Sequence, residues 1–409
     1  MSTTTTIPPA AKPIVDEPCP MPVRWGPEEL ARLTAMLSQP SLFYWKGPQT
    51  TACVDEFHRQ YPLKYRFPCS SGTASLHIAV AALRLRPGEE VIVPPITDMG
   101  SVIGILYQQG VPVFTDLDPR TYTLDPAAIR RAITGKTRAI MAVHLAGNPC
   151  DMAAIMAIAR EHRVAVIEDC AQAWGAQHQG TPVGLIGDFG CFSLNDFKHI
   201  GCGDGGIVGT NSEDYGPNLN KWGDKSYNRV VGGRDPEDLA PNYRMSEPQA
   251  AVAAAQLTKL PEIVARRNRA GTRLTALLDG TPGLLLPRVV PGNTHSYWFY
   301  MLRVDLACFT VDRAALVAAF NAEGVVGGAG YLPRPMYRYP VFQNHNFFGG
   351  AWPVRDSGLT AMDYRAVSCP TTEAILNDCV ILKLNEAMND TYIEKVARAV
   401  RTVAGRLAR

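Results

Sequence analysis

The chain between residues 70 and 170 alternates short apolar segments with amphipathic ones. The apolar runs contain few charges and predict buried strands over residues 91–95, 111–116, 138–143 and 164–169. A helix is predicted after Asp125, because Asp is a typical N-cap and Pro126 suits the first helical position, and a second helix is predicted to start at Asp151. Buried strands separated by helices are typical of a mostly parallel sheet covered on both faces. This part of the chain therefore predicts an α/β domain.

The pattern changes near residue 245. Ser246 and Gln249 have the spacing of a capping box, and a long Ala-rich helix follows, with an interruption expected at Pro261. A strand and further amphipathic helices come after it and indicate a smaller α+β unit. We therefore predict three regions, which are a flexible N-terminal arm over 1–20, a large α/β domain over 21–250 and a smaller α+β domain over 251–409.

Composition narrows the class of protein. The 409 residues carry 40 Lys and Arg against 38 Asp and Glu, a formal charge of +2, which argues against a strongly basic nucleic-acid-binding protein. The ten Cys form no CxxC pair and no zinc-ligand spacing, so no disulfide framework and no metal site is predicted. The N-terminus lacks a signal-peptide pattern, and no apolar run has membrane-spanning length. We expect a cytoplasmic protein without nucleic-acid or membrane partners.

A glycine motif offers a first candidate site. Gly201, Gly203 and Gly206 match GxGxxG, the fingerprint of dinucleotide-binding folds. That fingerprint must follow a strand and open a helix, whereas these glycines lead into the strand-like run IVGTN. We therefore do not expect a nicotinamide site here.

A helix start provides a second candidate. The stretch Ser70-Ser71-Gly72-Thr73 directly precedes the predicted helix ASLHIAVAAL. Backbone N–H groups at a helix N-terminus, with a glycine and hydroxyls beside them, can bind a phosphate. The alternative is an ordinary Ser or Thr N-cap, which by itself is the commoner explanation.

An acid at a strand end is the third candidate. Asp169 closes the run VAVIED, and Gln172 follows three residues later. Ligands of open α/β sheets bind beyond the carboxyl ends of the strands. A carboxylate buried there needs a cation, and the protonated ring nitrogen of a pyridine cofactor is one. Helix capping by Asp169 is the alternative.

Lys198 lies between an apolar strand that ends near Ser193 and the glycine run. An amine held by such a loop can form a Schiff base with an aldehyde. Taken alone, Lys198 could equally be a solvated lysine. The order of anion site, strand-end acid, Ser193 and Lys198, however, supplies what pyridoxal 5′-phosphate requires, namely a phosphate cradle, a partner for the pyridinium nitrogen and an imine-forming amine.

These motifs together resemble those of the DegT/DnrJ/EryC1/StrS aminotransferases, which are pyridoxal-phosphate enzymes of fold type I. The resemblance runs from about Phe43 to the C-terminus, and it is carried by the segments SSGTASLHIAVAAL, GEEVIVPPITDMGSV, GVPVFTDLDPRTYTLDPAAIRRAIT, VHLAGNPCDM, VIEDCAQAWGA, GDFGCFSLNDFKHIGCGDGGIVGTN and NYRMSEPQAAVAAAQL. It implies a large domain with a mostly parallel sheet and a smaller C-terminal α+β domain.

The resemblance also implies roles for individual residues. Lys198 would hold the cofactor covalently, Asp169 would pair with the pyridinium nitrogen, and Gln172 would lie near the phenolic oxygen. The phosphate would be bound by Gly72, Thr73 and Ser193. Asn242, with Arg244 close by, would reach the phosphate in the partner subunit, so the resemblance implies a homodimer with shared active sites.

The activity implied is amino transfer from an amino acid, glutamate or glutamine, to a keto sugar or keto-cyclitol, in antibiotic or surface-sugar biosynthesis. Two alternatives stay open, which are a sugar dehydratase of the same family and a non-catalytic regulator that binds the cofactor. The dehydratases have His in place of the Schiff-base Lys, and this chain has Lys198 followed by His199.

The chain departs from the family pattern at several positions. Relatives usually have an aromatic residue that stacks on the cofactor where this chain has Asp98 and Met99. Pro241 precedes Asn242 and restricts the backbone of that loop. Trp174 replaces a smaller ring and would either line the sugar pocket or fill the core.

Overall fold

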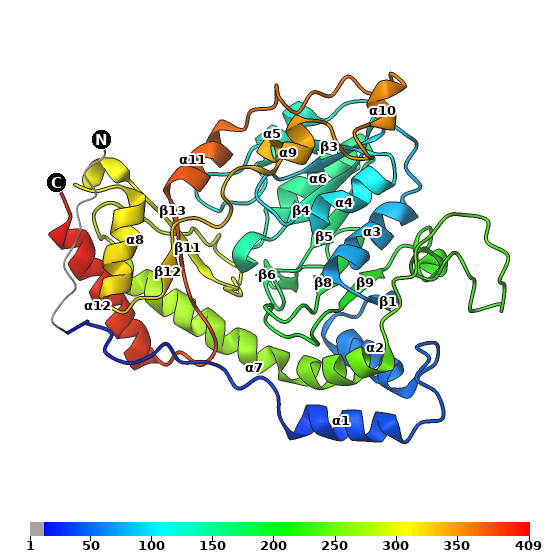
Figure 1. Ribbon diagram of the computed structural model, residues 1–409, viewed down its shortest axis with the longest axis horizontal. Helices are drawn as coiled ribbons and strands as arrows, with labels where there is room; N and C mark the ends of the chain where they lie inside the picture. Colours follow the sequence, from blue (N-terminus) through cyan, green and yellow to red (C-terminus); the bar gives the residue numbers. More distant parts are fainter. Residues whose placement is uncertain (1–11) are drawn as a thin grey trace.

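A computed structural model describes residues 12–409 and contains a seven-stranded sheet at its centre (Figure 1). The strand order is β1-β9-β8-β5-β4-β2-β3, and β9 alone runs antiparallel to its two neighbours in this sheet. This arrangement confirms the predicted α/β fold with a mostly parallel sheet. The strands are β1 (Tyr65–Cys69), β2 (Glu90–Val93), β3 (Val111–Phe114), β4 (Thr137–Val143), β5 (Ala165–Asp169), β8 (Phe189–Ser193) and β9 (Gly206–Thr210).

Helices cover this sheet. The Asp125 carboxylate accepts hydrogen bonds from two first-turn amides of α5, so the predicted N-cap is confirmed. The helix predicted from Asp151 is confirmed as α6, and Asp151 itself is its N-cap, because its carboxylate accepts from the Ala154 amide. The helices of this part of the chain are α1 (Pro27–Leu37), α2 (Pro48–Gln60), α3 (Gly72–Ala82), α4 (Gly100–Tyr107), α5 (Pro126–Ala132) and α6 (Met152–His162).

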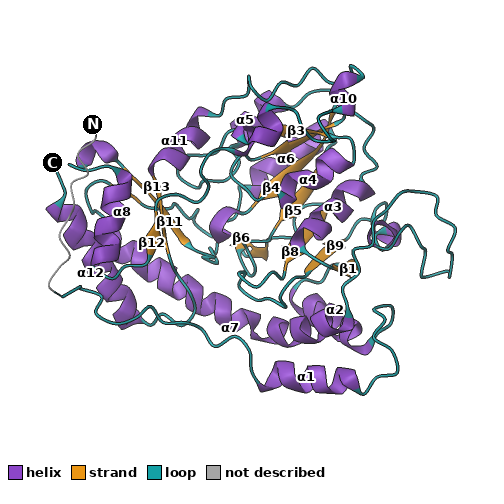
Figure 2. Cartoon of the chain, viewed as in Figure 1, coloured by secondary structure: helices purple, strands orange, loops and turns teal. Residues whose placement is uncertain are grey.

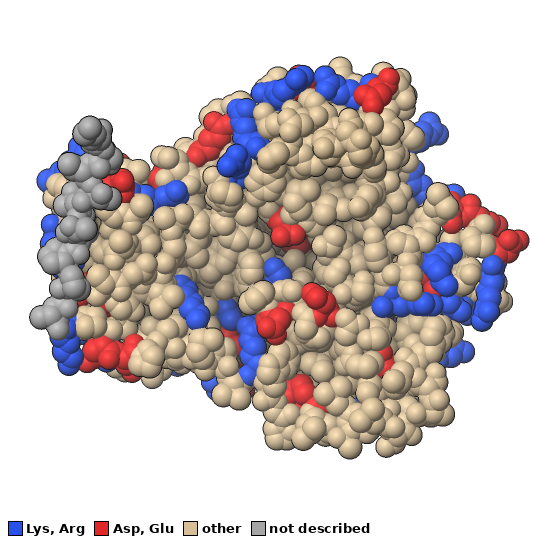
Figure 3. Space-filling model, viewed as in Figure 1, with Lys and Arg blue, Asp and Glu red and all other residues tan. Residues whose placement is uncertain are grey.

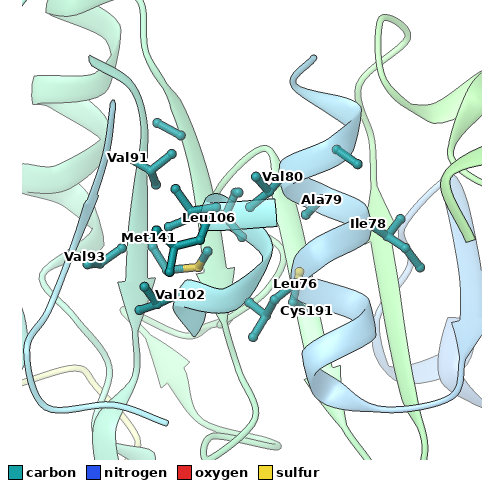
Figure 4. Packing of buried hydrophobic residues seen from close by; sticks show 14 of the residues in the cluster. Leu76, Ile78, Ala79, Val80, Val91, Val93, Val102, Leu106, Met141 and Cys191 are labelled. Carbon is teal, nitrogen blue, oxygen red and sulfur yellow. The ribbon is translucent and has the colours of Figure 1, made fainter. Parts of the chain in front are cut away.

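The core of the large domain lies between α3, α4 and the sheet (Figure 4). Leu76 and Val80 of α3 meet Val102 of α4 and the sheet residues Val91 and Met141 in one buried cluster. Almost every residue of α3 is buried, because this helix packs against the sheet and also against α4. The apolar character of the GTASLHIAVAA segment on all sides therefore has a packing explanation. This packing holds the N-terminus of α3 at the sheet edge.

The C-terminal domain contains a separate antiparallel sheet in the order β10-β11-β13-β12 (Figure 2). Its strands are β10 (Leu284–Leu285), β11 (Tyr300–Val304), β12 (Gly327–Gly328) and β13 (Cys379–Leu382). The remaining helices and the small hairpin are α8 (Arg313–Ala322), α9 (Pro340–Gln343), α10 (Pro353–Asp356), α11 (Pro370–Asp378), α12 (Asp390–Arg406), β6 (Gln177–His178) and β7 (Thr181–Pro182).

The long helix α7 (Glu247–Leu278) connects the two sheets, since it packs against α2 at one end and α12 at the other. The capping box of Ser246 and Gln249 is confirmed. The interruption expected at Pro261 is wrong, because the helix continues through it. Proline removes one backbone donor, which leaves the carbonyl of Leu257 without its helical partner. The side-chain amide of Gln60 donates to that carbonyl at 2.6 Å.

The N-terminal segment follows the C-terminal domain before it reaches α1. Residues 1–11 of the predicted arm lie outside the described residues. From residue 12 onward the chain is held by specific contacts, since Val15 is buried and its amide donates to the carbonyl of Glu323 at 3.0 Å. The ammonium of Lys395 pairs with the carboxylates of Asp16 and Glu17.

The described surface mixes both signs of charge. Lysines and arginines are interspersed with acids on the face that Figure 3 shows, in keeping with the small formal charge of +2. Among residues 12–409, no helix combines the length and the hydropathy needed to cross a membrane.

The contact between Gln60 and α7 makes a prediction about stability. Gln60→Ala leaves the Leu257 carbonyl without a donor, and we expect the free energy of unfolding to fall by about 1–2 kcal/mol. In a Pro261→Ala background the new amide at 261 can donate to the same carbonyl, so the cost of Gln60→Ala should largely disappear. Urea unfolding of the four proteins measures this cycle, and equal costs in both backgrounds would contradict the explanation.

Candidate active site

Two neighbouring parallel strands bring the predicted site residues to one edge of the sheet. Asp169 is the last residue of β5 and pairs in register with Cys191 of β8, which ends two residues later at Ser193. Because β5 and β8 are parallel, both carboxyl ends lie at the same edge. Asp169 and Ser193, which are 24 residues apart in the sequence, therefore lie at the same edge of the sheet.

The start of α3 lies against the same edge. Ser71 is the N-cap, and the amide of Ser75 makes the first intrahelical bond, to the carbonyl of Ser71. The amides of Gly72 and Thr73 precede that bond and belong to the set that a helix leaves for an anion. A Cβ on Gly72 would lie 2.6 Å from the Cβ of Ser193, so only glycine permits this contact between the helix start and the end of β8.

Asp169 is buried, with 4% of its surface exposed. Its carboxylate accepts hydrogen bonds from the Ser101 hydroxyl at 2.7 Å and from the Ala171 amide at 3.0 Å. Burial raises the pKa of Asp169, and these bonds together with the positive charge of Lys198 partly oppose the rise. A buried carboxylate of this kind is well suited to a cationic ligand.

Lys198 lies in the loop that follows β8, and its backbone amide donates to the carbonyl of Asn195. Its ammonium nitrogen lies 3.9 Å from the centre of the Trp298 ring, which is a cation–π contact. Burial lowers the pKa of Lys198, while the negative charges of Asp169 and Asp98 act in the opposite direction. A lower pKa leaves more of the free amine, which is the form that attacks an aldehyde.

Gln172 lies between the large domain and the C-terminal domain. Its side-chain oxygen accepts from the Ala146 amide at 2.9 Å, and its side-chain nitrogen donates to the Tyr331 hydroxyl at 3.0 Å. Sequence reasoning missed Tyr331, Trp298 and Ser101 as residues of this site. No local motif marks them, because each reaches the site only through tertiary contacts.

Asn242 is set apart from the other predicted residues. Its side chain is exposed, and its backbone bridges to Asp224 beside the edge strand β1. Asp224 is buried and accepts hydrogen bonds from Tyr44, Arg229 and Arg244. The segment before Asn242 projects from the large domain as a loop (Figure 1).

The departures from the family pattern have distinct structural outcomes. Met99 packs on the core, whereas Asp98 is exposed and its carboxylate accepts from the Gly100 amide at 2.8 Å. Trp174 is fully buried against Phe57 and Phe192 and therefore fills the core rather than a pocket. The glycine run leads into β9, as predicted from its context.

A group that resembles a metal site lies behind Asp169. Ligating atoms of His144, Glu168 and Cys170 lie within 4.8 Å of one another, and all three residues are buried. The two Glu168 oxygens already accept four hydrogen bonds, from His144 and from the amides of Gly184, Ile186 and Gly187. Four is the full acceptor capacity of a carboxylate, so this cluster is a hydrogen-bonding hub of the fold.

The residues present fit pyridoxal phosphate. Backbone amides without intrahelical partners at the start of α3, a buried carboxylate and a partly desolvated lysine lie at one edge of the sheet. Fold and site together define a fold type I enzyme that uses this cofactor. The chain belongs to the DegT/DnrJ/EryC1/StrS aminotransferase family, which matches residues 25–401. It is accordingly a pyridoxal-phosphate-dependent aminotransferase.

Individual relatives support this assignment. The chain is 33% identical over 338 residues to a UDP-N-acetyl-3-dehydro-α-D-glucosamine 3-aminotransferase of Acidithiobacillus ferrooxidans, covering 81% of this chain and 82% of the relative. It is 37% identical over 272 residues to a GDP-perosamine synthase of Caulobacter vibrioides, covering 64% and 71%. The crystal structure of an aminotransferase from Psychrobacter cryohalolentis has a TM-score of 0.84 at 28% identity, covering 95% of this chain and 100% of that one.

The charge of Asp98 makes a prediction about Lys198. Asp98→Asn removes a negative charge that raises the pKa of Lys198, so this pKa should fall further in the cofactor-free protein. The pH midpoint for reductive methylation of Lys198 by formaldehyde should therefore move to lower pH. Peptide mass spectrometry measures it. The exposed Asp279→Asn is the control, and an unchanged midpoint in Asp98→Asn would show that the two charges do not interact.

Proposed function

We propose that this enzyme transfers an amino group from glutamate or glutamine to a keto sugar or keto-cyclitol, in antibiotic or surface-sugar biosynthesis in the cytoplasm. The observation that carries the proposal is the meeting of Lys198, Asp169 and the start of α3 at one sheet edge. The choice of acceptor is supported by the two relatives above, whose names describe aminated sugar nucleotides.

The chemistry of each residue suggests which group of the cofactor it would bind. The amides of Gly72 and Thr73 and the hydroxyl of Ser193 would bind the phosphate. Lys198 would form the covalent bond. Asp169 would face the ring nitrogen, and Gln172 the phenolic oxygen. In these assignments each hydrogen-bond donor of the protein faces an acceptor of the cofactor, and the carboxylate faces its cationic nitrogen.

Pyridoxal phosphate, when bound, supplies an aldehyde carbon and a ring that withdraws electrons. Asp169 would hold a proton on the ring nitrogen, and the resulting positive charge would compensate the carboxylate and lower its raised pKa. As a free amine, Lys198 would act as the general base and acid that moves a proton to and from the α-carbon of the donor. The same amine would act in the opposite direction for the acceptor ketone. Donor and acceptor therefore use one site in turn.

Measurements on the holoenzyme test this proposal. Borohydride reduction followed by peptide mapping should place the cofactor on Lys198, and glutamate or glutamine without acceptor should convert the bound cofactor to its amine form. Asp169→Asn should keep the label on Lys198 but lose turnover by about 10²–10³-fold, the effect of removing a preorganised electrostatic group. A panel of keto sugars and inososes, assayed for amination, then identifies the acceptor.

Asp188→Asn is the matched control, because Asp188 bonds the Val166 amide near the opposite end of the same strand pair. It should retain turnover. Label on another lysine would refute the assignment of Lys198. Near-normal turnover of Asp169→Asn would refute the role of Asp169, and absence of conversion by any donor would favour the regulator over the aminotransferase.

We also propose a homodimer in which Asn242 completes the partner's phosphate site. The exposed position of Asn242 supports this proposal, as do the apolar side chains on the loop before it. Val230, Val231 and Leu239 are exposed by 72%, 76% and 95%. An apolar loop on the surface is typical of an interface, and a two-fold dimer would use it twice.

Subunit mixing tests the shared site. Lys198→Ala and Asn242→Ala chains should each be impaired, but their heterodimer would have one site with both lesions and one with neither, so part of the activity should return. Mixing Lys198→Ala with Asp169→Asn is the control. Each chain supplies both of these residues to its own site, so each site of the heterodimer keeps one lesion and no activity should return. Verified exchange without recovery in the first mixture would show that Asn242 does not act across an interface.

A further inference from the structure

The side-chain amide of Gln172 has a defined orientation. Its oxygen faces the backbone amide of Ala146, at 2.9 Å, and a backbone N–H can only donate. The oxygen is therefore the acceptor, and the amide nitrogen must be the atom that approaches Tyr331. The two hydrogens on this nitrogen leave one for Tyr331 and one for a ligand.

The backbone of Ala146, which donates to the Gln172 side chain, is itself constrained. Ala146 has φ of +58°, in the left-handed region that residues with a Cβ avoid. Its carbonyl accepts from the Trp298 amide at 2.8 Å, so the turn is held from two sides. One strained residue thus connects Gln172 to the segment that carries Trp298. Conformations of this kind persist only where the surrounding contacts determine them.

Tyr331 comes from the loop after β12 in the C-terminal domain, yet it reaches this part of the large domain. Its ring centroid lies 5.1 Å from that of Phe299 and 6.2 Å from that of Trp298. The Trp298 ring also contacts the Lys198 ammonium. Burial and the nearby Asp98 raise the pKa of Tyr331, so its hydroxyl stays protonated at ordinary pH. The hydroxyl oxygen can accept from Gln172 without losing its own proton.

We propose that Tyr331 is a positioning residue that locks the Gln172 amide with its nitrogen toward the phenolic oxygen of the bound cofactor. The proposal rests on the cofactor placement given above. With Ala146 on its oxygen and Tyr331 on its nitrogen, the amide can offer the ligand only an N–H. The C-terminal domain thereby contributes the hydrogen bond of Tyr331 to Gln172, in addition to the contact of Trp298 with Lys198.

This lock has a spectroscopic consequence. An N–H donated to the phenolic oxygen stabilises that oxygen as an anion, which lowers the pH at which the absorption of the bound cofactor changes from its acidic to its alkaline form. In Tyr331→Phe the Ala146 amide still holds the oxygen, but the nitrogen loses the acceptor that fixes its second hydrogen, so the plane of the amide is less constrained and its N–H donates less well to the ligand. The midpoint of the absorption titration should therefore rise by about 0.5–1 pH unit, the size expected when one neutral hydrogen bond is weakened.

The titration is made on the holoenzyme, with Gln172→Ala as the second background. If Tyr331 acts through Gln172, Tyr331→Phe should raise the midpoint in the wild type but add no further shift in Gln172→Ala. Tyr339→Phe makes the same chemical change nearby, at a hydroxyl that does not bond Gln172 among the described residues, and should leave the midpoint unchanged.

A second readout needs no cofactor. In the cofactor-free protein, Tyr331→Phe should lower the urea midpoint in the wild type by at least twice as much as in Gln172→Ala. Equal losses in both backgrounds, or an unchanged absorption midpoint in Tyr331→Phe, would overturn the lock. A changed acceptor KM with an unchanged absorption midpoint would make Tyr331 a substrate contact instead. Wild-type protein that binds no cofactor at Lys198 would overturn the proposed function as well, so the two failures are distinguishable.

Discussion

A carboxylate buried at the end of a central strand needs a compensating positive charge. Asp169 is such a carboxylate, and the groups around it must supply that charge or leave room for a ligand that does. Ser101 and the Ala171 amide supply hydrogen bonds, but neither carries charge. Lys198 supplies a charge only while it is protonated, and burial disfavours that state. These surroundings therefore favour a ligand that brings its own cation to Asp169 and leaves Lys198 free to react, which is the chemistry of a pyridinium aldehyde.

The site also depends on how the two domains are joined. Helix α7 spans both sheets without a break because Gln60 satisfies the carbonyl that Pro261 leaves open. The chain after it contacts the large domain at several places, and two of these contacts lie at the candidate site, Trp298 beside Lys198 and Tyr331 beside Gln172. Any motion between the domains would therefore affect the candidate cofactor site through these two side chains.

Much of the fold could be predicted from local patterns. The caps at Asp125 and Ser246 and the helix start near Asp151 have short-range causes, and the structure confirms all three. Pro261 shows the limit of such reasoning, because the penalty for a proline depends on whether a distant side chain can replace its missing donor. Trp174 shows it again, since an aromatic residue after a strand can face a pocket or the core, and only the neighbours Phe57 and Phe192 decide.

The sequence by itself determined the order of anion site, acid and lysine, and the parallel strands that bring them to one edge. It could do so because the apolar periods set the strand ends, and parallel strands place those ends together. Only the tertiary structure decided which way the Gln172 amide points and what lies beside Lys198. Those outcomes depend on Tyr331 and Trp298, which are 159 and 100 residues away along the chain and carry no local signal of the contact.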